Sequence, residues 1–135
     1  MSYGISITLD ETFDDAMARV RDALAEQGFG ILTEIDMAAT LHQKLGVEVA
    51  PQVILGACNP PLAHRAVQTE ESIGLLLPCN VVVRAAEAGV VVEALDPQIM
   101  VRVTGNDDLT AVADEAAARL RQALSTLQRS RTEQT

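Results

Sequence analysis

The stretch Val81–Leu95, VVVRAAEAGVVVEAL, decides the fold. Two runs rich in valine and alanine flank Glu87-Ala88-Gly89, a pattern that predicts two strands joined by a hairpin turn. A hairpin joins antiparallel strands, so the sheet must contain at least one antiparallel pair. We expect the first strand to begin upstream at Ser72 and to continue to Ala85. Pro78 in its middle cannot donate a hydrogen bond, which predicts a bulge, an edge or a bend.

Three further strands are predicted before the hairpin. Residues 3–9 alternate between apolar and small polar side chains, which is the period of a half-buried strand. Residues 30–36 are expected to form the next strand. Gln52–Cys58, QVILGAC, is apolar on both faces and is therefore predicted to be a central, well-covered strand.

Two long amphipathic helices are also predicted. Thr12 is a good N-cap for the first, Asp15 stands at the capping-box position, and Gly28 is a natural stop. The second is a closing helix, in which apolar residues recur at helical spacing from Leu109 to Leu127. Both helices can bury their apolar stripes only by lying on one face of the sheet.

Short helices are expected between the strands. Residues 38–45 form one of them, with Leu41 and Leu45 on its inner side. Another begins after Asn59, since asparagine is a good cap and the prolines that follow are tolerated in a first helical turn. Residues 99–103 suit a helix and a strand equally well.

The sequence thus predicts an α+β domain, with a mostly antiparallel sheet of about five strands. Two long helices pack on one face, and short helices lie between strands. Residues 3–127 are expected to form this single domain, and residues 128–135 a frayed polar C-terminal tail.

Composition and charge exclude several classes of partner. Aromatic residues make up only 2% of the chain, which leaves few stacking surfaces for nucleic acids, flavins or sugars. The net charge is −9 and Lys44 is the only lysine, so phosphate backbones and anionic lipids are repelled. We therefore expect no nucleic-acid partner and no membrane partner. The N-terminus lacks the pattern of a signal peptide, which predicts a cytoplasmic protein.

Cys58 is the first candidate for chemistry. It precedes Asn59-Pro60, where the start of a helix would offer free backbone N–H groups to a thiolate or an anion. Free cysteine is also among the most buried residue types, so Cys58 can equally be a small core residue.

Cys79, next to Pro78, is the second candidate. If its strand is a neighbour of the strand that carries Cys58, the two thiols can form a redox pair or share a metal. Their long spacing is not that of a recognised thiol site. His64 stands beside Arg65, which favours a solvated or anion-contacting face.

Motifs for known chemistry are absent from the sequence. It has no phosphate-binding loop, nucleophile elbow, zinc-protease helix or zinc-finger spacing. We therefore predict no metal site and no cofactor, and an enzymatic role is not favoured.

Three stretches carry a resemblance to a known family: QVILGACNP at 52–60, GLLLPCNVVV at 74–83, and Asp96-Pro97 ahead of the closing helix. From Tyr3 to Leu127 the chain resembles the bacterial and archaeal family called domain of unknown function 302. The resemblance implies a TATA-binding-protein-like fold of the type β-α-β(4)-α. It implies no established activity and no catalytic residue, and the name of the fold carries no nucleic-acid function here.

Three functions remain open. The favoured one is a module that binds a small molecule or an anion in a pocket between the sheet and the short helices. Its expected site residues are Cys58, Asn59, Pro60, His64, Pro78 and Cys79. The second is a thiol redox or metal-binding protein that uses the two cysteines. The third is a structural or interaction protein, a homodimer in which a second copy covers an exposed sheet edge or apolar face.

Overall fold

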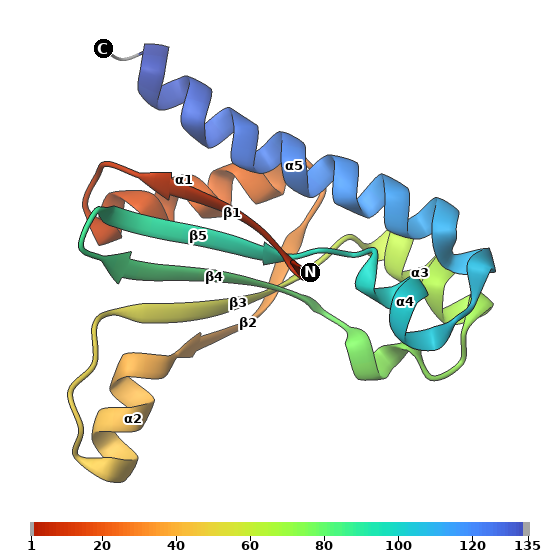
Figure 1. Ribbon diagram of the computed structural model, residues 1–135, viewed down its shortest axis with the longest axis horizontal. Helices are drawn as coiled ribbons and strands as arrows, with labels where there is room; N and C mark the ends of the chain where they lie inside the picture. The colour runs from red at the N-terminus through yellow and green to blue at the C-terminus, as the bar shows by residue number, and fades with distance from the viewer. Residues whose placement is uncertain (1, 134–135) are drawn as a thin grey trace.

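A computed structural model describes residues 2–133 of the chain, and the burial of side chains over residues 2–129. A five-stranded antiparallel sheet in the order β1-β5-β4-β3-β2 forms its centre (Figure 1). The strands are β1 Gly4–Leu9, β2 Gly30–Asp36, β3 Gln52–Cys58, β4 Cys79–Ala86 and β5 Gly89–Leu95. The helices are α1 Phe13–Glu26, α2 Met37–Leu45, α3 Pro60–Thr69, α4 Ile99–Thr104 and α5 Thr110–Glu133, with 3-10 helices η1 Ile73–Leu76 and η2 Asp107–Leu109.

This order of elements confirms the predicted α+β architecture. Every strand pair of the sheet is antiparallel within the described residues. Without the short helices, the chain runs strand, helix, four strands, helix, which is the order that the family resemblance implies.

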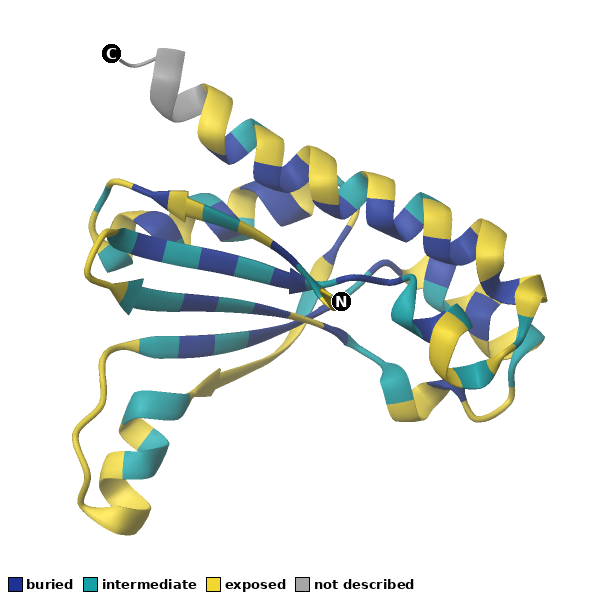
Figure 2. Ribbon diagram, in the orientation of Figure 1, coloured by how far each residue is buried: buried dark blue, intermediate teal, exposed yellow. Residues whose placement is uncertain are grey.

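The two long helices, α1 and α5, lie side by side on one face of the sheet, as predicted (Figure 1). Figure 2 shows the buried residues concentrated between these helices and the strands. The main core is almost wholly aliphatic, and its fully buried side chains include Leu24, Leu55, Val83, Val92 and Leu120. Phe29 is the aromatic residue buried among them.

The start of α1 follows the predicted cap. The hydroxyl of Thr12 accepts a hydrogen bond of 3.1 Å from the backbone N–H of Asp15. Asp14 and Asp15 place negative charge at the positive end of the helix, which stabilises it.

A second, smaller apolar cluster lies beyond the end of the sheet, under the first half of α5 (Figure 1). It gathers Leu62 and Ala66 of α3, Ile73 of η1, Met100 of α4, Leu109 of η2, and Val112, Ala113 and Ala116 of α5. The second half of α5 contributes Leu120, Ala123, Leu124 and Leu127 to the main core. One helix therefore takes part in both clusters.

The opposite face of the sheet carries no long helix in residues 2–133. Figure 2 shows α2 projecting beside β2 and β3 without a buried residue, and Leu41 is only half-buried. The inward position predicted for Leu45 is wrong, because the last turn of α2 extends past the sheet and leaves this side chain exposed. None of the helices in this part of the chain is long and apolar enough to cross a membrane.

The predicted hairpin is present, but its first strand is shorter than expected. Residues 73–76 form η1, and β4 begins only at Cys79. Pro78 therefore precedes the strand and does not interrupt it. A residue without an N–H is tolerated at that position because it lies outside the hydrogen-bonded ladder.

The structure also sets three boundaries that the sequence did not define. Residues 99–103, which suited either structure, are helical and belong to α4. The closing helix continues to Glu133, through most of residues 128–135, for which a frayed polar tail is predicted; residues 134–135 lie outside the described range. β3 is an interior strand whose residues are all buried or half-buried, and β4 holds the middle position of the sheet.

Gly89 closes the hairpin in a conformation that requires glycine. Its φ is +132°, and a side chain there would collide with the backbone carbonyl of Leu9 on β1. We expect Gly89→Ala to lower the free energy of unfolding by about 2 kcal/mol, through backbone strain and steric overlap. Urea denaturation measures the change.

Gly74 provides the matched control for this substitution. A side chain at Gly74 would have no atom within 4 Å, so Gly74→Ala should change the stability little. Equal effects of the two substitutions would contradict this account of the hairpin.

Candidate functional site

A small cavity of about 30 Å3 lies where the main core meets the second cluster. Phe29 and Ala57 of the main core line one side, and Leu62, Met100 and Val112 line the other. The remaining lining residues are Cys58, Asn59, Ala63, Ala66, Leu77, Pro78, Cys79 and Ala116. The cavity is therefore an apolar seam between two separately packed parts of the domain.

The two cysteines lie on neighbouring strands at this seam, and the strand register places their side chains on opposite faces of the sheet. β3 and β4 are paired, and Ala57 lies directly opposite Cys79, so Cys58 stands one residue beyond the partner of Cys79. Both cysteines are free thiols; Cys58 is half-exposed, and Cys79 is only 8% exposed. Burial raises the pKa of the Cys79 thiol to about 11, and the proximity of Cys58 contributes to the rise.

Gly56 allows the start of β4 to lie against β3 at this point. A Cβ atom on Gly56 would stand 2.8 Å from Cγ of Pro78 and would overlap the hydroxyl of Thr33. Pro78 and Thr33 thus occupy the space that a side chain would take. The close approach positions Pro78, and the adjacent Cys79, at the cavity wall.

Asn59 lines the cavity, but its amide is occupied by structural hydrogen bonds. Its side-chain oxygen accepts from the N–H of Leu62 at 3.4 Å, and its Nδ2 donates to the carbonyl of Gln27 at 3.3 Å. The same carbonyl accepts from Arg119 at 3.3 Å. Asn59 therefore connects the end of α1 and the start of α3.

The start of α3 offers no free backbone donor. Pro60 and Pro61 have no N–H, the N–H of Leu62 is bonded to Asn59, and the N–H of Ala63 donates to the carbonyl of Asn59 at 2.9 Å. The sequence-based expectation of free N–H groups at this helix start is wrong. The reason for expecting an anion or a stabilised thiolate there is removed.

The structure brings together four of the six predicted site residues. Cys58, Asn59, Pro78 and Cys79 line the cavity, whereas Pro60 and His64 do not. Both of the latter are exposed on α3. His64 is therefore on a solvated face, which was one of the two positions considered for it.

Met100 is a lining residue that the sequence did not indicate. It is only 3% exposed, and α4 carries it into the cavity wall. Its N–H donates to the carbonyl of Pro97 at 3.0 Å, and its carbonyl accepts from the Thr104 hydroxyl at 2.6 Å. The local pattern of residues 99–103 could not reveal this, since it did not distinguish a helix from a strand.

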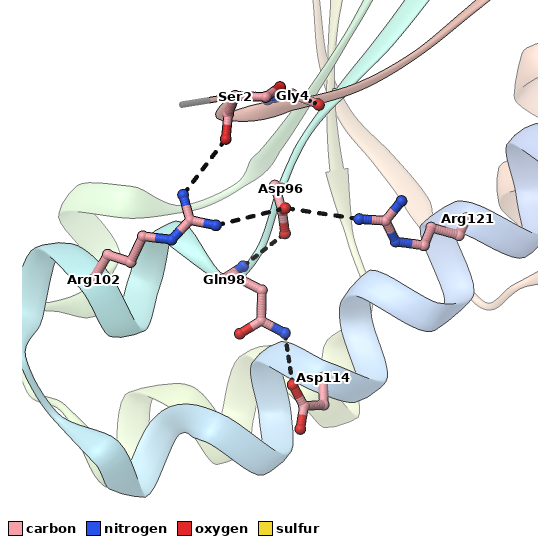
Figure 3. Close-up of polar contacts among 7 residues, drawn as sticks. All are labelled: Ser2, Gly4, Asp96, Gln98, Arg102, Asp114 and Arg121. Atoms are coloured by element: carbon pink, nitrogen blue, oxygen red, sulfur yellow. Dashed lines mark hydrogen bonds and ion pairs between the residues drawn. The ribbon is translucent and has the colours of Figure 1, made fainter.

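A buried carboxylate fixes the position of α4 (Figure 3). Asp96, 8% exposed, accepts a hydrogen bond of 3.0 Å from the N–H of Gln98. Arg102 of α4 and Arg121 of α5 each approach its Oδ2 within 3.9 Å from opposite sides. Gln98 also donates to Asp114 of α5 at 2.6 Å. The end of β5, α4 and α5 are thereby joined through polar contacts next to the second cluster.

A larger hollow of about 520 Å3 lies on the open face of the sheet. Tyr3, Gln52, Asn80, Val82 and Glu93 are among the residues that line it. The Glu93 carboxylate in this hollow is already paired with Arg84 at 3.1 Å. Polar and apolar side chains both line this hollow, and it lies apart from the residues that the sequence singled out.

Comparison with known proteins identifies the family. Residues 5–127 match the family described as "Domain of unknown function DUF302". The chain belongs to the DUF302 family. A similar solved structure is the "Crystal structure of uncharacterized conserved protein DUF302 from Bacillus stearothermophilus", at 25% sequence identity and a TM-score of 0.86 over 93% of this chain and 98% of that one. No curated protein matches the chain.

The two thiols of this DUF302 domain should differ sharply in reactivity. At pH 8 a thiol reagent should modify the half-exposed Cys58 first, because Cys79 is buried and its pKa is raised from 9.0 to about 11. Between pH 9 and pH 10 the rate at Cys79 should rise nearly tenfold with its thiolate fraction, whereas the rate at a thiol with the ordinary pKa of 9.0 rises less than about twofold. Mass spectrometry of peptides measures the modification rates of Cys58 and Cys79. In urea, where the chain is unfolded, these two rates should become equal. Equal rates in the folded protein would show that Cys79 is not protected.

Proposed function

We propose that this DUF302 chain is a binding domain whose ligand occupies the cavity lined by Cys58, Asn59, Pro78 and Cys79. One observation carries the proposal: residues from the end of β3 and the start of β4 meet at a single void between two packed clusters. Interiors are normally close-packed, and a void lined by two free thiols is an unusual feature of such a small core.

The size of the cavity limits the ligand. A volume of about 30 Å3 is well below the roughly 300–1,000 Å3 of sites for metabolites. The ligand we propose is therefore an ion or a group of a few atoms. An anion is disfavoured, because the start of α3 provides no free N–H and the chain carries a net charge of −9.

The lining also favours binding over catalysis. Among the described residues that line the cavity, none is a histidine, an aspartate or a glutamate. A cysteine nucleophile is usually activated by an adjacent general base, and neither thiol has one in this lining.

Filling the cavity tests the proposal. Native mass spectrometry of the reduced wild-type protein should show an added mass that is lost on denaturation. Ala63 lies half-buried in the cavity wall, and Ala63→Leu should abolish the added mass because the larger side chain takes up the void. Ala118 is exposed on α5, so Ala118→Leu should retain it. A wild-type protein at its sequence mass would contradict the proposal.

A second candidate function, homodimer formation, is favoured by the apolar surface of residues 32–49. Large hydrophobic side chains are exposed at Leu32, Ile35, Leu45, Val47 and Val49. A short isolated helix is marginal in water, and α2 has no buried residue to stabilise it. β2 is also an edge strand with unpaired backbone groups. Antiparallel pairing of β2 with β2 of a second copy would cover Leu32 and Ile35 together.

Sedimentation velocity tests the dimer. The wild-type chain should sediment as a dimer, and Leu32→Lys should make it a monomer by placing a charge in the interface. Leu75 is equally apolar and 87% exposed on η1, so Leu75→Lys should leave the dimer intact. A monomeric wild type, or a dimeric Leu32→Lys variant, would reject this interface.

A further inference from the structure

The hollow on the open face of the sheet, opposite α1 and α5, is not used by the proposed function (Figure 1). Its volume of about 520 Å3 falls within the roughly 300–1,000 Å3 that is typical of small-molecule sites. It shares no lining residue with the cavity at the seam. No described residue of β2 lines it either, so pairing of two copies through β2 would leave it open.

The strand register brings polar side chains from three neighbouring strands together in this hollow. Ser6 of β1 lies opposite Glu93 of β5, and Glu93 lies opposite Val82 of β4. Asn80 precedes Val82 by two residues, so both side chains point to the same side of the sheet. The flanking residues that are buried in the main core on the other side are Ile5, Val81 and Val92. Ser6, Asn80 and Glu93 therefore converge on the open face.

Asn80 has no structural role that explains its position. The chain contains three asparagines, and the side chains of the other two, Asn59 and Asn106, accept hydrogen bonds from backbone N–H groups at helix starts. Asn80 instead lies within β4, although asparagine is depleted in strands. Its side chain is exposed and forms no hydrogen bond within the described residues. Its amide is thus available to a ligand.

Glu93 gives the hollow its charge, because it is the only charged side chain among the described lining residues. Arg84 lies outside the lining, and its Nε and Nη2 atoms both approach the same oxygen of Glu93, Oε1, at 3.1 Å. The other oxygen, Oε2, has no partner within the described residues. Ser6 and Gln52 are likewise without side-chain hydrogen bonds there, and each adds a neutral acceptor.

We propose that this hollow binds a small organic cation, an ammonium group on a short alkyl chain. An ammonium group has three donors and no acceptor, which matches Oε2 of Glu93 together with the amide oxygen of Asn80. Val82 and Leu95 are half-buried in the lining and offer apolar surface to the alkyl chain. The net charge of −9 attracts cations to the protein and repels anions.

A metal cation fits this hollow poorly. Ca(II) takes about six to eight oxygen ligands, several of them from carboxylates, whereas Glu93 is the one carboxylate among the described lining residues. Within residues 2–133, no group of three or more histidine, cysteine, aspartate or glutamate side chains could hold a metal. The single charge and the neutral acceptors suit an organic cation that also makes apolar contacts.

A titration followed by NMR of the 15N-labelled full chain tests the proposal with 1,4-diaminobutane as the probe. The amide signals of Ser6, Asn80 and Glu93 should shift and saturate as the diamine is added. The matched neutral ligand is 1,4-butanediol, which has the same chain length and no charge. It should bind at least about fivefold more weakly, because it cannot form the ion pair with Glu93.

Three variants locate the binding. Glu93→Gln should weaken binding of the diamine about fivefold, since it removes the charge and keeps the size of the side chain. Glu87→Gln is the matched control: Glu87 is exposed in the hairpin turn and does not line the hollow, so the same change in net charge should leave the affinity unaltered. A side chain at Gly4 would meet only the carbonyl oxygen of Ala94, at 3.7 Å. Gly4→Leu should therefore be tolerated, extend into the hollow and abolish binding.

Other outcomes would overturn the inference. Equal weakening by Glu93→Gln and Glu87→Gln would show a general attraction to the acidic chain without a site. Equal binding of the diol and the diamine would show that the charge is not recognised. Absence of saturable shifts, or binding retained in Gly4→Leu, would remove the site from this hollow. Thermal unfolding establishes that each variant is folded, and Glu93→Gln keeps the test valid if Gly4→Leu is unstable.

Discussion

Burial of a single sheet face beneath α1 and α5 is the constraint on which the rest of the structure depends. Both long helices lie on that face, so the strands can be covered on one side only, and the main core forms there. α5 extends past the end of the sheet (Figure 1). Its first half is therefore available to cover α3, η1, α4 and η2 as a second cluster. The cavity lies at the junction that this arrangement creates.

The chemistry of the candidate site follows from that junction. Strand β3 ends at the cavity with Cys58, and strand β4 begins there with Cys79; both strands belong to the main core. Helix α4, which belongs to the second cluster, places Met100 in the cavity wall. The hydrogen bonds of Asn59 and the ion pairs of Asp96 fix the surrounding backbone. Polar side chains in this region act as structural connections between the elements that surround the cavity.

Local signals predicted most of the fold. The Thr12 cap, the hairpin and the amphipathic spacing of the closing helix each depend on residues close together in sequence, and all are present. Features set by distant contacts could not be predicted. Whether residues 99–103 form a helix depends on packing against α5, and the proximity of Cys58 and Cys79 depends on which strands pair. The free N–H groups expected after Asn59 were excluded by the two prolines and the cap itself, a consequence that was readable from the sequence.

The shared helix α5 has a consequence for cooperativity. Neither cluster can lose its packing without removing contacts from the same continuous helix, so the free energies of opening the two clusters are linked. We expect amide hydrogens on both sides of the seam to exchange together, as one cooperative unit. In such a unit, any group that bridges the seam would stabilise the whole domain.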